Sequence, residues 1–274
     1  MRSRFTDCLV GILKFLPAAL ALPGGMLSPG ALAAEGGPTV PQASIALIID
    51  DLGNQYFRDS QAVALPGPVA CAFLPHAPFT RTLAGRAHAD GKEVLAHLPM
   101  QALGEELHES GELTLDMTQQ QFQRTLQRDL AAVPHASGIN NHKGSLLTRH
   151  PGDMAWLMRG LRRRGLFFVD SRTTAGTVAR QLAMEYRVPN TERKVFLDNV
   201  QSSEAIEAQF RRLLVIARQQ GTALAIGHPH AKTLAVLRRE LARLDDYHIR
   251  LVPVSRLIEI EHRRLDSWQA SLSR

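Results

Sequence analysis

The chain has 274 residues, of which 45% are hydrophobic and 21% are charged, so it is long enough for one large domain with a buried core. Its formal net charge is +6, which on its own would fit a nucleic-acid binder. Only 5% of the residues are aromatic, however, so a base-stacking surface is not expected and we set that hypothesis aside.

Residues 1–34 have the order of a secretory signal, with a basic start at Arg2 and Arg4, an apolar stretch, and small residues at 31–34. Lys14 and two prolines interrupt the apolar stretch, so we predict export to the periplasm or medium rather than a permanent membrane span. Removing this segment takes away three basic residues and one acidic residue and lowers the net charge to +4. Cys71 is then the single cysteine, which excludes an internal disulfide and predicts a buried thiol.

A flexible leader rich in glycine, proline and alanine is predicted at 35–43, followed by one domain at 44–262 and a C-terminal tail at 263–274. Inside the domain, short apolar runs are typical of buried parallel strands. Seven such runs occur, at 45–49, 69–74, 93–98, 166–169, 195–197, 223–226 and 249–252.

Amphipathic segments between the runs predict helices. Thr118, Asp153 and Ser203 are the expected capping residues at three helix starts, and Gly165 and Gly221 end the second and third. Strands that alternate with helices predict an α/β fold with a mostly parallel sheet, either open and doubly wound or an incomplete (β/α) barrel. In both, ligands bind at the carboxyl ends of the strands.

Polar residues follow the predicted strands at several of these ends. Asp50 and Asp51 come directly after one run, His97 ends another, and His228 follows a third. His142 lies in a polar segment at 138–145 that we interpret as a loop. Neighbouring carboxylates repel unless a cation or proton intervenes, and histidine with carboxylate is a typical zinc ligand set. Each residue alone also has a structural interpretation, such as a helix cap for the aspartates.

Five segments, taken in order, carry a resemblance to the divergent polysaccharide deacetylase family, a branch of the NodB-like carbohydrate deacetylases. They are Ile48–Gly53, Glu93–Met100, Gly138–Ser145, Phe168–Ser171 and Ile226–His230. The resemblance implies an incomplete (β/α) barrel, here of about seven parallel strands, over most of residues 44–258.

The resemblance also implies roles for individual residues. It makes Asp50 the general base, Asp51 and His97 metal ligands, and His228 the acid that protonates the leaving group. His142 is our own hypothesis for the third metal ligand, because the second histidine of the active enzymes is replaced by Gln101. The remaining strand-end residues are assigned to substrate binding: Asn141, Asp170, Arg172 and His230.

The residues predict an exported hydrolase that uses a divalent metal, by expectation zinc, and the family resemblance implies that it removes acetyl groups from a cell-envelope or extracellular glycan. The alternative is an inactive carbohydrate- or metal-binding envelope protein with the same fold. Gln101 favours the alternative, whereas Asp50 and His228 favour the enzyme, because pure binding needs neither a spare base nor an acid. The strand pattern does not decide whether His228 or His230 faces the pocket, and only the family resemblance selects His228.

Overall fold

The computed structural model describes residues 42–105 and 109–272, so the predicted signal and most of the leader lie outside the described residues. Nine strands occur within these ranges: β1 (Ser44–Leu52), β2 (Ala70–Phe73), β3 (Val94–Met100), β4 (Ala136–Lys143), β5 (Phe167–Asp170), β6 (Asn190–Glu192), β7 (Val195–Phe196), β8 (Thr222–Gly227) and β9 (Arg250–Leu251). The α-helices are α1 (Tyr56–Val63), α2 (Thr80–Ala89), α3 (Gln119–Ala132), α4 (Pro151–Arg164), α5 (Ala179–Glu185), α6 (Ser203–Gln220), α7 (Ala231–Leu241) and α8 (Val254–Leu272).

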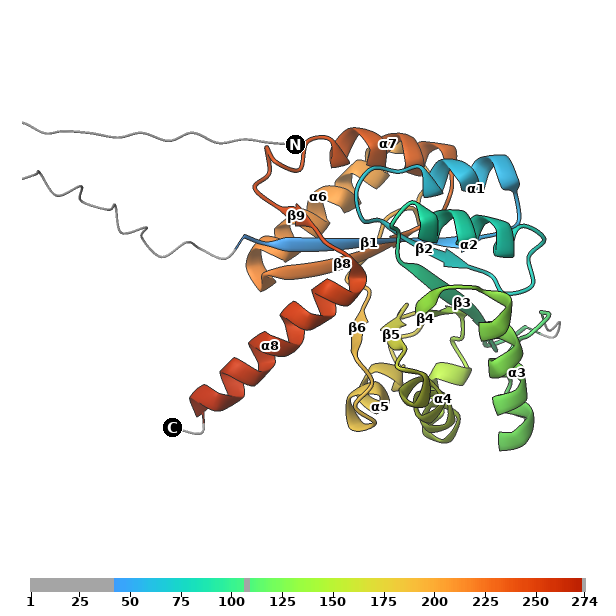
Figure 1. Ribbon diagram of the computed structural model, residues 1–274. Helices are drawn as coiled ribbons and strands as arrows, with labels where there is room; N and C mark the ends of the chain where they lie inside the picture. The colour runs from blue at the N-terminus through green and yellow to red at the C-terminus, as the bar shows by residue number, and fades with distance from the viewer. Residues whose placement is uncertain (1–41, 106–108, 273–274) are drawn as a thin grey trace, which may run out of the picture. The chain divides into compact units, whose positions relative to one another are not determined.

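The strands form one sheet whose ladders are all parallel. Their order is β6-β5-β4-β3-β2-β1-β8-β7, and β9 pairs with the start of β1. β6 and β7 are at opposite ends of this order, yet only two residues separate them in the chain, so the sheet must curve until its two edges lie close together. The fold is therefore an incomplete α/β barrel (Figure 1), as predicted.

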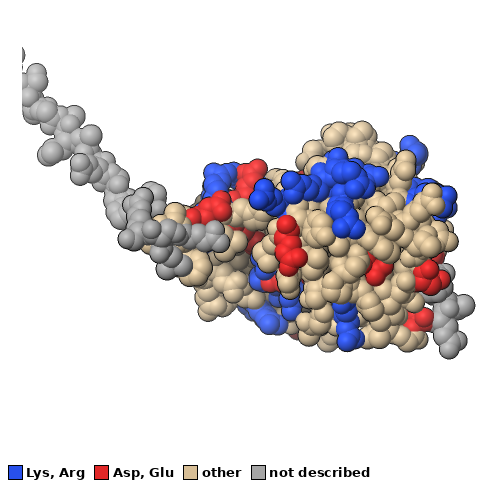
Figure 2. Space-filling model, turned by 90° about the horizontal axis from the view of Figure 1, so that it is seen from below, with Lys and Arg blue, Asp and Glu red and all other residues tan. Residues whose placement is uncertain are grey.

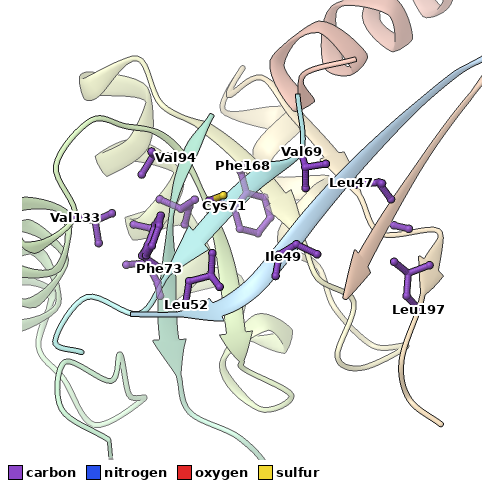
Figure 3. Packing of buried hydrophobic residues seen from close by; sticks show 14 of the residues in the cluster. Leu47, Ile49, Leu52, Val69, Cys71, Phe73, Val94, Val133, Phe168 and Leu197 are labelled. Atoms are coloured by element: carbon purple, nitrogen blue, oxygen red, sulfur yellow. The ribbon is translucent and has the colours of Figure 1, made fainter. Parts of the chain in front are cut away.

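Two hydrophobic clusters divide the core. The larger lies between the sheet and helices α1–α7, and Figure 3 shows Leu47, Ile49 and Cys71 among its residues. The smaller contains the alternate residues of the same strands, such as Ala46 and Ile48, which pack against the first turns of α8. Because successive strand residues point to opposite faces, this second cluster fills the barrel interior and α8 closes its amino-terminal end.

Glu93 fixes the start of α8 in this position. Its carboxylate accepts hydrogen bonds from the backbone N–H groups of Val254, at 2.6 Å, and Ser255. A carboxylate at a helix N-terminus satisfies donors that have no partner inside the helix. The amino-terminal end of the barrel is thus plugged, and the opposite end is the one available for a polar site.

The fold class and the buried thiol of Cys71 are confirmed, and burial raises the pKa of that thiol to about 12. Two strands are additional to the seven expected. Residues 138–145 were interpreted as a loop, but most of this segment is β4, which pairs with β3 and β5 on its two sides. β6 was also missed, because three polar residues carry no apolar pattern.

The helix starts and ends were predicted with mixed success. The capping box at Thr118 and the ends at Gly165 and Gly221 are confirmed. Asp153 is not the cap of α4, which begins earlier with Pro151 in its first turn, where a missing N–H costs nothing. The cap of α6 is Ser202 rather than Ser203. α8 runs to Leu272, so residues assigned to a tail are helical.

In the described ranges no helix combines the length and apolarity that a membrane crossing requires. On the face seen in Figure 2, basic side chains gather in a band, and acidic side chains are scattered around it.

Candidate active site

On several barrel strands the last apolar residue that faces the interior is followed, two positions later, by a polar residue, and these polar residues form the site. Inward residues of β1, β3 and β8 are Ile48, Leu95 and Ile226, and two residues further on stand Asp50, His97 and His228. The same count along β4 and β7 leads to two further buried residues, Asn140 and Asp198. The parallel direction of the strands therefore places all five side chains at the carboxyl-terminal end of the barrel.

Asp51 reaches the same site by breaking the strand alternation. It follows Asp50 directly, so a regular strand would point it to the outer face. Its φ is +58°, and the register between β1 and β2 shifts between Ile49 and Leu52. A non-glycine residue in this region costs free energy, typically about 1–3 kcal/mol, and persists where the surroundings enforce it. Here it brings two adjacent carboxylates into one site.

Three ligand atoms converge at Asp51. Its Oδ1 lies 3.0 Å from His142 Nδ1 and 3.3 Å from His97 Nε2, and the two histidine nitrogens are 3.1 Å apart. Oδ1 is buried and has no hydrogen-bond donor in good geometry. Zinc ligands lie about 2.0–2.1 Å from the metal, which places tetrahedral ligands about 3.3 Å from each other. The three atoms therefore have the donor types and spacing that a divalent cation requires.

Asn140 connects this group to Asp50. Its Nδ2 donates to Asp50 Oδ1 at 2.8 Å and to Oδ2 at 3.0 Å, so its Oδ1 faces His97 Nδ1 at 2.9 Å. An amide oxygen only accepts, so Nδ1 of His97 must carry the proton. In the neutral ring the lone pair of His97 is then on Nε2, directed toward Asp51 and His142, as metal binding requires.

Glu109 has a comparable position behind His142. Its Oε2 lies 3.5 Å from His142 Nε2, on the side of the ring opposite the contact with Asp51, and its Oε1 lies 2.7 Å from Lys143 Nζ. A carboxylate behind a ligating histidine favours the tautomer whose other nitrogen is free to bind metal.

The acidities of the group follow from burial and charge. Burial raises the pKa of Asp50, and the nearby His97 and His228 offset this only in part. Burial also acts on Asp51, but its contacts with His142 and His97 outweigh it and hold its pKa far below the usual range. Burial would lower the pKa of His97, yet the two aspartates raise it to about 9. Two neighbouring carboxylates are thus pushed apart in pKa, the pattern of a base beside a ligand.

His228 is held by Asp198. Asp198 accepts from His228 Nδ1 at 2.9 Å, from the backbone N–H of His228 at 2.7 Å, and from the Thr233 hydroxyl at 2.8 Å. Burial lowers the pKa of His228, but Asp198 and the two site aspartates raise it above the ordinary value. The other ring nitrogen, Nε2, lies 3.7 Å from Asp51 Oδ2 and is oriented as a proton donor toward the site.

Two hollows meet at this group and share Asp51, His142 and His228. One, of about 390 Å³, is lined further by Asn141, Arg172 and others, and the second, of about 500 Å³, extends past His230. A groove therefore runs across the cation position in both directions.

The predicted substrate residues are placed differently from one another. Asn141 accepts from the backbone N–H of Ser171 at 2.8 Å, and Arg172 pairs with Glu192 at 2.8 Å. Asp170 lines neither hollow, because its oxygens accept from the Arg172 backbone and the Thr177 hydroxyl. These assignments to substrate binding stay predictions.

Gln101 does not take the place of a ligand. Its side-chain oxygen accepts from the backbone N–H of Leu115 at 2.9 Å and so braces the following loop. His142, from the neighbouring strand β4, supplies the second histidine nitrogen beside Asp51. Three site residues were not found from the sequence: Asn140, Asp198 and Glu109. Asp198 could have been found by counting inward positions from the predicted strand at 195–197, whereas Asn140 lies on β4, which was interpreted as a loop.

Comparison with known proteins identifies the family of the chain. The model of the family described as "Divergent polysaccharide deacetylase" matches residues 47–258. The chain belongs to the divergent polysaccharide deacetylase family. The region of this family match includes every residue of the candidate site, from Asp50 to His228.

Two bacterial proteins are similar over most of the chain. The uncharacterized protein YibQ of Escherichia coli is 38% identical over 214 residues, which are 78% of this chain and 67% of YibQ. An uncharacterized protein of Haemophilus influenzae is 36% identical over 216 residues, 79% of this chain and 77% of its own length.

Solved structures confirm the deacetylase-type fold. Protein ATU2773 of Agrobacterium tumefaciens superposes with a TM-score of 0.77 at 21% identity, covering 80% of this chain and 90% of its own. The peptidoglycan deacetylase PdaC of Bacillus subtilis superposes with a TM-score of 0.51 at 13% identity, covering 84% and 97%. At these identities the likeness concerns the fold alone.

Proposed function

We propose that the protein is an exported, metal-dependent deacetylase that acts on an acetylated glycan of the cell envelope. The observation that carries the proposal is the juxtaposition at one groove of three ligand atoms, from Asp51, His97 and His142, with a separate carboxylate, Asp50, and a separate histidine, His228. Membership of the family supports a carbohydrate substrate, and the basic and apolar start of the chain supports export.

Asp51, His97 and His142 would hold the cation, with zinc as the ion that suits two nitrogens and one carboxylate oxygen. When bound, such an ion polarises the acetyl carbonyl and makes water a better nucleophile. Asp50 accepts the proton of the attacking water, and Asn140 holds its carboxylate in place with bonds to both oxygens.

His228 acts on the leaving group, which is the sugar nitrogen or oxygen that carried the acetyl group. As the bond between the acetyl carbon and the sugar nitrogen or oxygen breaks, Nε2 of His228 donates its proton to the leaving atom, and acetate is the second product. Asp198 accepts from Nδ1–H and so stabilises the doubly protonated ring, in which Nε2 also carries a proton. The raised pKa of His228 favours the protonated ring that an acid requires.

The alternative of an inactive binding protein rested on Gln101. In the fold Gln101 is used to brace the loop at Leu115, while His142 provides a ligand nitrogen, so the departure at Gln101 does not remove the metal site. Asp198 adds to the case for catalysis, because an oriented, protonated histidine serves a proton transfer and is not needed for binding alone.

Two measurements test the proposal. Zinc content of the purified protein should be near one ion per chain and should fall strongly in His142→Ala, while Gln101→Ala, the matched control, should retain the ion. Acetate release from N- and O-acetylated glycans should depend on added metal and be lost in Asp50→Asn. Equal zinc in both variants would remove the ligand assignment, and acetate release that survives Asp50→Asn would remove the base. Absence of acetate with every glycan and metal would favour the binding protein.

A further inference from the structure

A second hollow, far from the candidate active site, is lined by arginines. It measures about 430 Å³ and lies beside Ser44, at the start of β1. Three parts of the chain supply its five guanidinium groups: the end of α6 (Arg218), β9 (Arg250) and α8 (Arg256, Arg263 and Arg264). We refer to these five residues as the arginine hollow.

The charges of the arginine hollow are poorly neutralised. Among the described residues only Glu259 forms ion pairs with it, to Arg256 at 2.6 Å and to Arg263 at 3.1 Å. Arg218 and Arg264 donate to backbone carbonyl oxygens, which carry no net charge. Arg250 is exposed, and its guanidinium group has no hydrogen bond or ion pair with described residues, whereas its backbone N–H donates to the Ala43 carbonyl oxygen at 2.9 Å. Five like charges with one counter-charge raise the free energy of the isolated fold and attract an anion.

Exposed apolar side chains accompany the arginines on α8. Trp268 is 61% exposed and Leu265 is 45% exposed. Trp268 is four residues after Arg264, so the two side chains share one face of the helix. Tryptophan beside arginine on a helix surface is the combination that favours the boundary between lipid headgroups and acyl chains.

The arginine hollow and the candidate active site lie at opposite ends of the barrel. The arginine hollow lies at the amino-terminal end of the barrel, near the end that α8 plugs, whereas the candidate active site is at the carboxyl-terminal end. Gln42, the first described residue, also lines the hollow.

We propose that the arginine hollow and Trp268 dock this end of the domain on an anionic membrane leaflet. The guanidinium groups bind lipid phosphates, since their planar N–H groups match phosphate oxygens, and Trp268 enters the headgroup region. The groove at the other end of the barrel then faces away from the lipid, toward soluble or wall-bound glycan.

Binding of the full chain to vesicles tests this proposal. Phosphatidylcholine vesicles, with and without 30% phosphatidylglycerol, would be sedimented with the protein, and the ratio of the two partition coefficients measured. The ratio cancels any contribution of the apolar start of the chain. The double variant Arg250→Gln/Arg263→Gln should lower the ratio about 30-fold, which corresponds to about 1 kcal/mol per arginine near an anionic surface.

A matched control removes two exposed arginines elsewhere, Arg81 on α2 and Arg124 on α3, each by substitution with glutamine. This variant should keep the wild-type ratio, and Trp268→Ala should weaken binding to the anionic vesicles. Each variant should have the same thermal unfolding midpoint as wild type, which would show that the substitutions leave the fold intact.

The proposal is wrong if the control and the double variant lower the ratio of partition coefficients equally, because binding would then depend on net charge alone. It is also wrong if the double variant has the wild-type ratio. A third result would also contradict it: a wild-type ratio of partition coefficients near one, together with a thermal midpoint that millimolar inorganic phosphate raises in wild type but not in the double variant. That result would assign the arginine hollow to a soluble anion.

Discussion

Replacing Asn140 by alanine tests the connection between the base and the ligand set. Asn140 is fully buried, and its amide contacts both oxygens of Asp50 and Nδ1 of His97. Truncation leaves the His97 N–H without a partner and removes the amide donor that contacts both oxygens of the buried Asp50 carboxylate. An unsatisfied buried group costs about 1–3 kcal/mol, so we expect a loss of unfolding free energy in that range.

Two functional readouts should change with it. Loss of the partner that orients a ligating histidine weakens metal affinity, typically by about 10–100-fold. The hydrogen bond from Asn140 lowers the pKa of Asp50, so its loss raises that pKa further. Because the base works as the carboxylate, the acidic limb of the kcat/KM profile for acetate release should move to higher pH.

The matched control is Asn141→Ala, the next residue on β4. Asn141 bonds Ser171 and Lys143 but neither Asp50 nor His97, so its truncation should lower stability without moving the acidic limb. Zinc affinity would be measured by competition with a chelator, and the pH profile with one acetylated glycan. The reasoning fails if Asn140→Ala keeps both wild-type zinc affinity and the wild-type acidic limb, or if Asn141→Ala shifts them equally.

Three further changes have defined outcomes. Asp198→Asn should lower kcat about 10²–10⁴-fold, which is the usual contribution of a positioned acid. It should also move the alkaline limb of the pH profile for acetate release to lower pH, because the pKa of His228 falls. An unchanged rate would exclude His228 as the acid. Gln101→His should not raise zinc affinity in a chelator titration, since the side chain points to the loop. Burial raises the pKa of Asp129 to about 6, although His76 opposes it. The protonated carboxyl therefore stabilises the folded state fully below its unfolded pKa, near 4, and this stabilisation is lost as the pH rises through 6. Urea titrations should show wild type losing up to about 3 kcal/mol relative to Asp129→Asn between pH 4 and 7; parallel curves would contradict this.

The sequence was sufficient for the strands that carry apolar runs, and for the residues that end them. Asp50, His97 and His228 follow such runs, so the rule that ligands bind at strand ends found them. β4 escaped because its buried positions include Asn140 and Asn141, whose polar groups are satisfied by partners from β1, β3 and the segment after β5. Nothing in a local window reveals partners that are distant in sequence.

Other features of the site depend on the backbone. The positive φ of Asp51, which turns it to the same side as Asp50, has no local marker such as glycine. Asp198 was within reach of the sequence, since it stands two residues after Phe196 on the inward face of a predicted strand. His228 rather than His230 reaches Asp51. Both histidines lie an even number of residues after Ile226, so the strand alternation alone does not make that choice.

The junction between β6 and β7 has a consequence for how this barrel can change its width. The two edge strands are joined by Arg193 and Lys194 through covalent bonds, with no ladder between them. Arg193 holds the junction by donating to the carbonyl oxygens of Ser171 and Arg172. Each residue inserted there would lengthen the link by about 3.3 Å without breaking any strand pairing. The circumference next to the groove can therefore be adjusted at one point, so that related chains can differ in the width of the groove while Asp51, His97 and His142 on β1, β3 and β4 stay in register.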